Sequence, residues 1–82
     1  MKYLFFSSQH CTPCQAIKPQ ILKHPQIEII DVDKKNELAV KFGIMSIPTL
    51  LILNKDDSVE QQIDGAKIGK FIRENFKNGT KI

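Results

Sequence analysis

The sequence predicts a single α/β domain with the element order β-α-β-α-β-β-α, in which four strands form a mixed sheet flanked by three helices. Short apolar runs of strand length alternate with stretches whose apolar residues recur at the 3.6-residue period of a helix. The 82 residues have room for one hydrophobic core only. We expect the domain to extend over residues 1–77 and the tail, residues 78–82, to be frayed.

The first half of the chain predicts a strand, a helix and a second strand. Residues 3–6 are continuously apolar, and residues 27–32 are rich in β-branched side chains, as is typical of covered strands. Between them, residues 11–24 carry apolar side chains at helical spacing. These apolar residues are Ala16, Ile17, Ile21 and Leu22.

Three prolines mark the course of this helix. Pro13 suits the first turn, where its missing N–H has no partner within a helix. Pro19 lies mid-helix and removes the hydrogen bond to the Gln15 carbonyl, which predicts a kink. Pro25 pushes the residue before it out of the helical region, so we expect the helix to end at His24 and this histidine to lie on the surface.

The second half predicts a short helix, a hairpin and a final helix. Residues 36–42 form the short helix, which Gly43 ends. Turn-forming residues join the hairpin strands, residues 49–53 and 59–63. The first hairpin strand is continuously apolar and predicts a central position, whereas the second alternates and predicts an edge. The last helix has one apolar stripe, formed by Ile68, Phe71, Ile72 and Phe76.

Composition and charge exclude several classes of protein. The 12 basic residues are scattered and leave a net charge of +3, so no basic tract predicts nucleic-acid binding. No apolar stretch approaches the roughly 20 residues of a membrane span, and the apolar run at residues 3–6 is too short for a signal peptide. We therefore expect a monomeric cytoplasmic protein that binds neither nucleic acid nor membrane.

The two cysteines, Cys11 and Cys14, are separated by two residues. A disulfide between them would close a very small ring and remove little entropy from the unfolded chain, so a chemical role explains the pair better than a stabilising one. A zinc site uses the same spacing, and His10 and His24 are possible further ligands. The predicted helix would place His24 about 20 Å from its start, so we predict no metal site, although this alternative stays open.

Several motifs occur in one order along residues 2–76, and together they resemble the thioredoxin and glutaredoxin superfamily. The motifs are Cys11-Thr12-Pro13-Cys14, Pro19 and Phe42-Gly43-Ile44-Met45-Ser46-Ile47-Pro48-Thr49. The chain has the size of a glutaredoxin, but proline directly before the second cysteine is a thioredoxin trait. The resemblance implies a compact thioredoxin fold, a cis peptide bond before Pro48 and binding of an extended substrate by the backbone of Ile47.

A cysteine at a helix N-terminus is stabilised as the thiolate, so we predict that Cys11 is the nucleophile and that Cys14, one turn further on, resolves the intermediate. Three neighbours are predicted to tune the pair: His10, Thr12 and Pro13. His10 replaces the usual thioredoxin tryptophan and either favours the thiolate when protonated or is a solvated loop residue.

Thioredoxins commonly bury an aspartate and a lysine beneath the second cysteine, and here these positions correspond to Phe5 and Ile29. An apolar environment raises the pKa of a thiol, so we expect the pKa of Cys14 to be raised. Without the buried acid, proton removal from Cys14 has to use water or a nearby side chain.

The predicted function is thiol-disulfide exchange that reduces protein disulfides, with no cofactor in the chain itself. The resemblance implies a flavin-dependent thioredoxin reductase as the electron-donating partner. Two alternatives remain. One is a glutathione-linked glutaredoxin, although Asp64-Gly65-Ala66-Lys67 has one glycine where glutaredoxins tend to have a pair. The other is a metal-binding module of thioredoxin-like fold.

Overall fold

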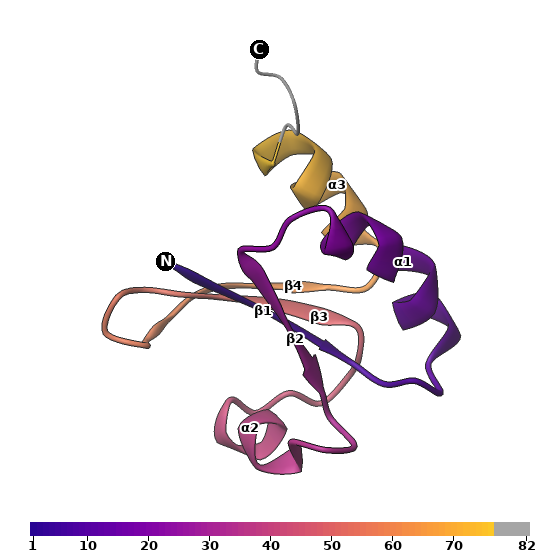
Figure 1. Cartoon of the computed structure of the whole chain (residues 1–82). Coiled ribbons are helices and arrows are strands. Elements are labelled where there is room, and N and C mark those ends of the chain that lie inside the picture. Colours follow the sequence, from indigo (N-terminus) through magenta and orange to yellow (C-terminus); the bar gives the residue numbers. More distant parts are fainter. Residues whose placement is uncertain (77–82) are drawn as a thin grey trace.

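The computed structural model describes residues 1–76, and their elements follow the predicted order (Figure 1). The bounds are β1 (Lys2–Ser7), α1 (Thr12–Leu22), β2 (Ile27–Asp31), α2 (Asn36–Lys41), β3 (Thr49–Leu53), β4 (Val59–Asp64) and α3 (Lys67–Asn75). Both the predicted domain limit at residue 77 and the predicted frayed tail fall outside the described residues, so they stay predictions. None of the helices up to residue 76 is long and apolar enough to cross a membrane.

The four strands form one mixed sheet in the order β2-β1-β3-β4. β1 runs parallel to β2 and antiparallel to β3, and β3 runs antiparallel to β4. The two continuously apolar strands, β1 and β3, are therefore central, as predicted. β4 lies at an edge, and only its Ile63 is buried, because an edge strand with one wet face has few neighbours to cover it.

Two apolar clusters cover the two faces of the sheet, because successive side chains of a strand point to opposite faces. Phe5 of β1 and Leu50 of β3 belong to the cluster beneath α1 and α3. Phe6 and Leu51 belong to the cluster beneath α2. Figure 1 shows α1 and α3 together on one side of the sheet and α2 alone on the other.

The buried stripe of α1 differs from the predicted one. Cys14 and Ile21 are buried and Ile17 is partly buried, whereas Ala16 and Leu22 face solvent. Residues 14, 17 and 21 share one face at about 100° per residue, and Leu22 lies a further 100° round the helix, beyond the width that α3 and the sheet cover. The helix continues through Pro19.

The prediction that His24 is a surface residue is wrong. Its side chain is buried, with only 7% exposed, and its ring centroid lies 5.1 Å from that of Phe76, at the end of α3. The cause is the tight turn after α1, in which the Ile27 N–H donates to the His24 carbonyl at 2.9 Å. This turn directs the ring towards α3 rather than towards solvent.

Glycines with positive φ mark two boundaries between elements, of which the one at Gly43 was predicted. Gly43, at φ +64°, follows α2, and Gly65, at φ +52°, joins β4 to α3. Residues with a Cβ rarely adopt this conformation, which explains glycine at both positions. The Gly65 N–H also donates to the Pro48 carbonyl at 3.0 Å, so this turn supports the segment before β3.

Candidate functional site

Cys11 is the N-cap residue of α1, and its sulfur takes the part that an oxygen usually plays at this position. The Cys14 N–H donates to Cys11 Sγ at 3.2 Å, and the Cys11 carbonyl accepts the first hydrogen bond of the helix, from the Gln15 N–H at 3.1 Å. The sulfur of Cys11 therefore lies at the positive end of the helix dipole.

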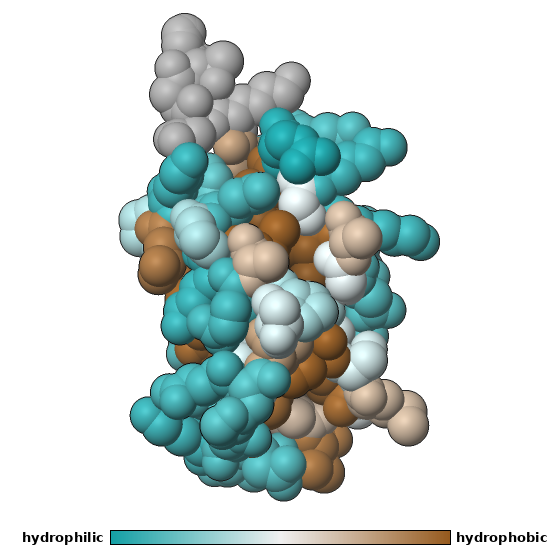
Figure 2. Space-filling view, turned by 90° about the vertical axis from the view of Figure 1, so that its right-hand side faces the viewer, coloured by the Kyte–Doolittle hydropathy of each residue, from teal (hydrophilic) through white to brown (hydrophobic). Residues whose placement is uncertain are grey.

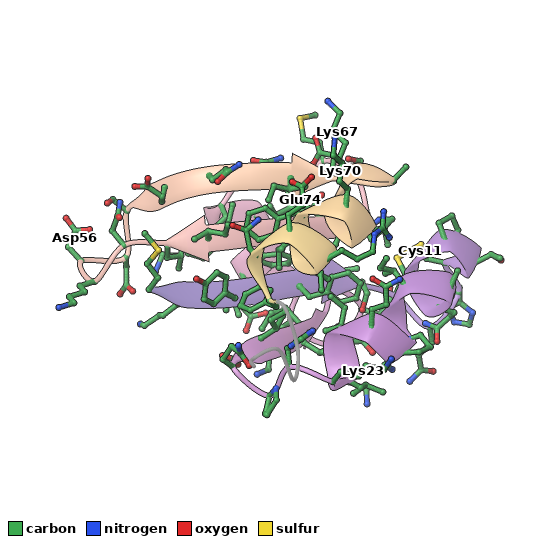
Figure 3. The ribbon with its side chains drawn as sticks, turned by 90° about the horizontal axis from the view of Figure 1, so that it is seen from above. Cys11, Lys23, Asp56, Lys67, Lys70 and Glu74 are labelled. Atoms are coloured by element: carbon green, nitrogen blue, oxygen red, sulfur yellow. A yellow bond between two sulfur atoms is a disulfide. The ribbon has the colours of Figure 1, made fainter. Side chains whose placement is uncertain are left out.

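The two cysteines form a disulfide, with their Cα atoms 5.2 Å apart. Figure 3 shows the sulfur–sulfur bond at the start of α1, beside the label of Cys11. Cys14 is fully buried, whereas Cys11 is partly exposed. An incoming molecule can thus approach the pair only from the side of Cys11.

The three residues predicted to tune the pair, His10, Thr12 and Pro13, are all exposed around Cys11. Pro13 lies in the first turn of α1, as predicted. The His10 side chain faces solvent, while its backbone N–H donates to Ser8 Oγ at 3.1 Å.

Phe5 and Ile29, the positions at which the resemblance leads one to look for buried charges, are neighbours in the structure. The register of β1 and β2 pairs the two residues directly. Phe5 is fully buried in the cluster beneath α1, and Ile29 packs against that cluster. The sheet therefore offers apolar side chains, and no carboxylate, at both positions.

Sheet register places the segment of Ile47 and Pro48 beside the segment that leads to the cysteines. Phe6 of β1 pairs with Thr49 of β3, so the end of β1 and the start of β3 meet at the same end of the sheet. The Ile47–Pro48 peptide bond is cis, Pro48 is buried and Ile47 is partly exposed. The segments that carry the four predicted residues therefore lie at this end of the sheet. These residues are Cys11, Cys14, Ile47 and Pro48.

A hydroxyl holds the segment before β3 in place. Thr49 is fully buried, and its Oγ1 lies 2.8 Å from the Ser46 carbonyl oxygen and 3.1 Å from Asp64 Oδ1. Its single proton can satisfy one of these acceptors at a time. Thr49 thereby links the segment of Pro48 to the end of β4.

An apolar hollow of about 240 Å³ adjoins Ile47. Its lining residues are Val32, Asn36, Ala39, Ile44, Met45, Ser46 and Ile47. Met45 at the rim is 95% exposed. Figure 2 faces this edge of the molecule and shows apolar side chains reaching the surface between polar ones.

Two polar residues at this end of the sheet, Ser8 and Asp33, were not among the predicted site residues. Ser8 follows β1 and Asp33 comes soon after β2, and Ser8 Oγ donates to Asp33 Oδ2 at 2.6 Å. A signal was available, because β1 and β2 are parallel and the carboxyl ends of parallel strands meet at one edge of a sheet. Among residues 1–76, no group of three or more His, Cys, Asp or Glu side chains is arranged to hold a metal ion.

Comparison with known proteins gives consistent results. The Thioredoxin family model matches residues 3–78. Thioredoxin of Bacillus subtilis is 40% identical over 65 residues, which cover 71% of this chain and 62% of that protein. Thioredoxin C-2 of Corynebacterium nephridii is 33% identical over 76 residues, which cover 80% of this chain and 70% of that protein.

Solved structures show the same fold. Thioredoxin 1 of Thermosipho africanus superposes with a TM-score of 0.73 over 99% of this chain and 100% of that one, at 22% identity. The chain thus matches the whole of one structural neighbour, whereas it spans 62% of the length of the Bacillus subtilis relative.

Proposed function

Because the chain belongs to the thioredoxin family, we propose that it is a thiol-disulfide oxidoreductase that reduces protein disulfides through Cys11 and Cys14. One observation carries the proposal. A partly exposed cysteine caps a helix N-terminus and is joined by a disulfide to a fully buried cysteine one turn further on. This arrangement separates an attacking sulfur from a resolving one.

The exchange proceeds in two steps from the reduced protein. The Cys11 thiolate attacks one sulfur of the substrate disulfide, forms a mixed disulfide and releases the other substrate sulfur as a thiolate. Cys14 then loses its proton and attacks Cys11 Sγ, which releases the second substrate thiolate and forms the Cys11–Cys14 disulfide. Two electrons pass from the protein to the substrate. One proton, the one lost by Cys14, balances one released thiolate, and the other thiolate takes a proton from solvent.

The surroundings of the two thiols push their pKa values apart. The helix dipole and the Cys14 N–H favour the thiolate of Cys11, so we expect its pKa to lie below the ordinary value of about 8.5. Cys14 is buried, and burial raises the pKa of a thiol. Because Phe5 and Ile29 supply no buried acid, water or a side chain beside the mixed disulfide takes the proton from Cys14.

The substrate is bound as an extended segment along Ile47 and Pro48. A partly exposed residue just before a strand can pair its backbone with such a segment, which is a form of β-augmentation. Sheet register brings this segment to the end of the sheet that carries Cys11. Selection of substrates then depends on backbone pairing and on apolar contacts at the hollow next to Ile47.

A flavin-dependent thioredoxin reductase is the proposed electron donor, and the protein acts as a monomer in the cytoplasm. The thioredoxin relatives and the proline before Cys14 favour this donor over glutathione. Rapid turnover with glutathione and glutathione reductase alone would instead support the glutaredoxin alternative.

Trapping with Cys14→Ser tests the proposal. The variant cannot resolve the intermediate, so substrate proteins should remain bound to Cys11 as mixed disulfides that dithiothreitol releases. Cys11→Ser is the matched control, because it keeps the buried thiol and removes the exposed one. Nonreducing gels followed by mass spectrometry measure the adducts. The proposal fails if Cys14→Ser forms no adducts, or if Cys11→Ser forms as many.

A further inference from the structure

Ser8 takes part in four hydrogen bonds beside the cysteines. Its hydroxyl donates to Asp33 Oδ2 at 2.6 Å and accepts from the His10 N–H at 3.1 Å. Its carbonyl accepts from the Cys11 N–H at 3.2 Å and from Gln15 Nε2 at 2.9 Å. The hydroxyl proton and both lone pairs of the carbonyl are thus in use.

These bonds connect the turn between β1 and α1 with the distant segment that follows β2. Ser8 follows β1, and His10 and Cys11 lead into α1. Asp33 lies after β2, 25 residues beyond Ser8. Ser8 is buried, with 7% exposed, whereas the Asp33 side chain is exposed. A hydroxyl that donates to a carboxylate becomes a better acceptor, so Asp33 strengthens the bond from the His10 N–H.

We propose that Ser8, held by Asp33, is a positioning residue for Cys11. It fixes the turn from residue 8 to residue 11 and thereby keeps the sulfur of Cys11 at the helix N-terminus, within reach of the Cys14 N–H. The inference rests on the proposed role of Cys11 as the nucleophile. Ser8 itself does not react, and its effect reaches the substrate through Cys11.

Two substitutions of Asp33 separate its hydrogen bond from its charge. Asp33→Ala removes both the charge and the acceptor, whereas Asp33→Asn removes the charge and keeps an oxygen that can accept from Ser8. Loss of the charge alone favours the thiolate equally in both variants. Any difference between the two therefore reports the hydrogen bond, and Asp33 is exposed, so neither variant leaves a cavity in the core.

The measurement is the rate of Cys11 alkylation by iodoacetamide against pH in the reduced full chain. We expect the pH midpoint of Cys11 alkylation in Asp33→Ala to lie about half a pH unit above that in Asp33→Asn, because the two variants differ by one hydrogen bond. Ser8→Ala should raise the midpoint relative to Ser7→Ala, which removes the neighbouring buried hydroxyl that takes no part in the four bonds.

Identical profiles for Asp33→Ala and Asp33→Asn overturn the inference, even if Ser8→Ala fails to fold. Equal profiles for Ser8→Ala and Ser7→Ala do so as well. The wild-type profile separates this result from failure of the proposed function. If wild-type Cys11 shows an ordinary thiol midpoint and exchanges with no disulfide, the nucleophile itself is wrongly assigned.

Discussion

The two ends of the sheet are held by different kinds of polar contact. Figure 3 shows Cys11 at one end and Asp56 at the other, in the hairpin between β3 and β4. In the hairpin, Ser58 Oγ bonds Asp56 Oδ1 at 2.6 Å and accepts from Asn54 Nδ2 at 3.1 Å, contacts between residues two and four positions apart. At the cysteine end, the bond of Ser8 to Asp33 spans 25 residues and the bond of Thr49 to Asp64 spans 15 residues.

This difference shows where the chain depends on tertiary structure. The contacts that shape the hairpin turn lie within its own five residues, and its long-range contact, between Asp57 and Lys2 55 positions away, is an exposed ion pair. The geometry around Cys11 depends on the ends of β1, β2 and β4, which folding has to bring together, and its contacts are partly buried. Losing a buried partner costs more than losing an exposed one, so substitutions at the cysteine end should have the larger effects.

Thr49→Val is the substitution expected to have the largest effect on stability among those that compare the two ends. It keeps the shape of the side chain and removes the hydroxyl shared by Ser46 and Asp64, which should lower the free energy of unfolding by about 1 kcal/mol. Urea denaturation measures this, with Thr49→Ser as the control that keeps the hydroxyl. Ser58→Ala in the hairpin should cost less, and an equal or larger cost would break the comparison.

Acid should affect the hairpin through Asp56. The hydrogen bonds from the Ser58 hydroxyl and N–H lower the pKa of Asp56 from its ordinary value of 3.8. The charged Asp56 carboxylate therefore stabilises the folded protein at pH values above its pKa in the unfolded chain. This contribution disappears as the pH falls through the lower pKa that Asp56 has in the folded protein. The melting temperatures of wild type and Asp56→Asn should therefore converge between pH 5 and pH 2, to a small extent because Asp56 is exposed. A constant gap would show that the carboxylate bonds add nothing.

The smallest effect is expected at the ion pair of Lys2 and Asp57. Their side chains lie 2.8 Å apart and are 59% and 52% exposed, so solvent screens the pair. The hydrogen bond and charge of Asp57 raise the pKa of Lys2 above 10.5. The charged Lys2 therefore stabilises the folded protein below pH 10.5, and this contribution disappears as the pH rises through the raised pKa of Lys2.

Lys2→Gln removes this charge. At pH 7 the melting temperature of the variant should be slightly lower than that of wild type, and 1 M NaCl should close the gap. A gap that salt leaves unchanged would mean that the side chain acts through packing.

Much of the fold was predictable because its patterns are local. The apolar run at residues 49–53 coincides with β3, the turn formers at 54–58 join it to β4, and Gly43 follows α2 with positive φ. The candidate cysteine pair was equally local, since its spacing and Pro13 place Cys11 at the start of a helix and Cys14 in its first turn. These features depend on residues a few positions apart, whose preferences act before distant elements meet.

The remaining features required the packed molecule. His24 was expected at the surface, but the ring lies against Phe76, which is 52 positions further along the chain. Leu22 shares the apolar character of Ile21, yet it stays exposed because α3 and the sheet cover only one face of α1. Residue type and period therefore establish the elements and the cysteine pair. Burial, and the bond between Ser8 and Asp33, depend on which distant surfaces come into contact, and a local pattern does not record that.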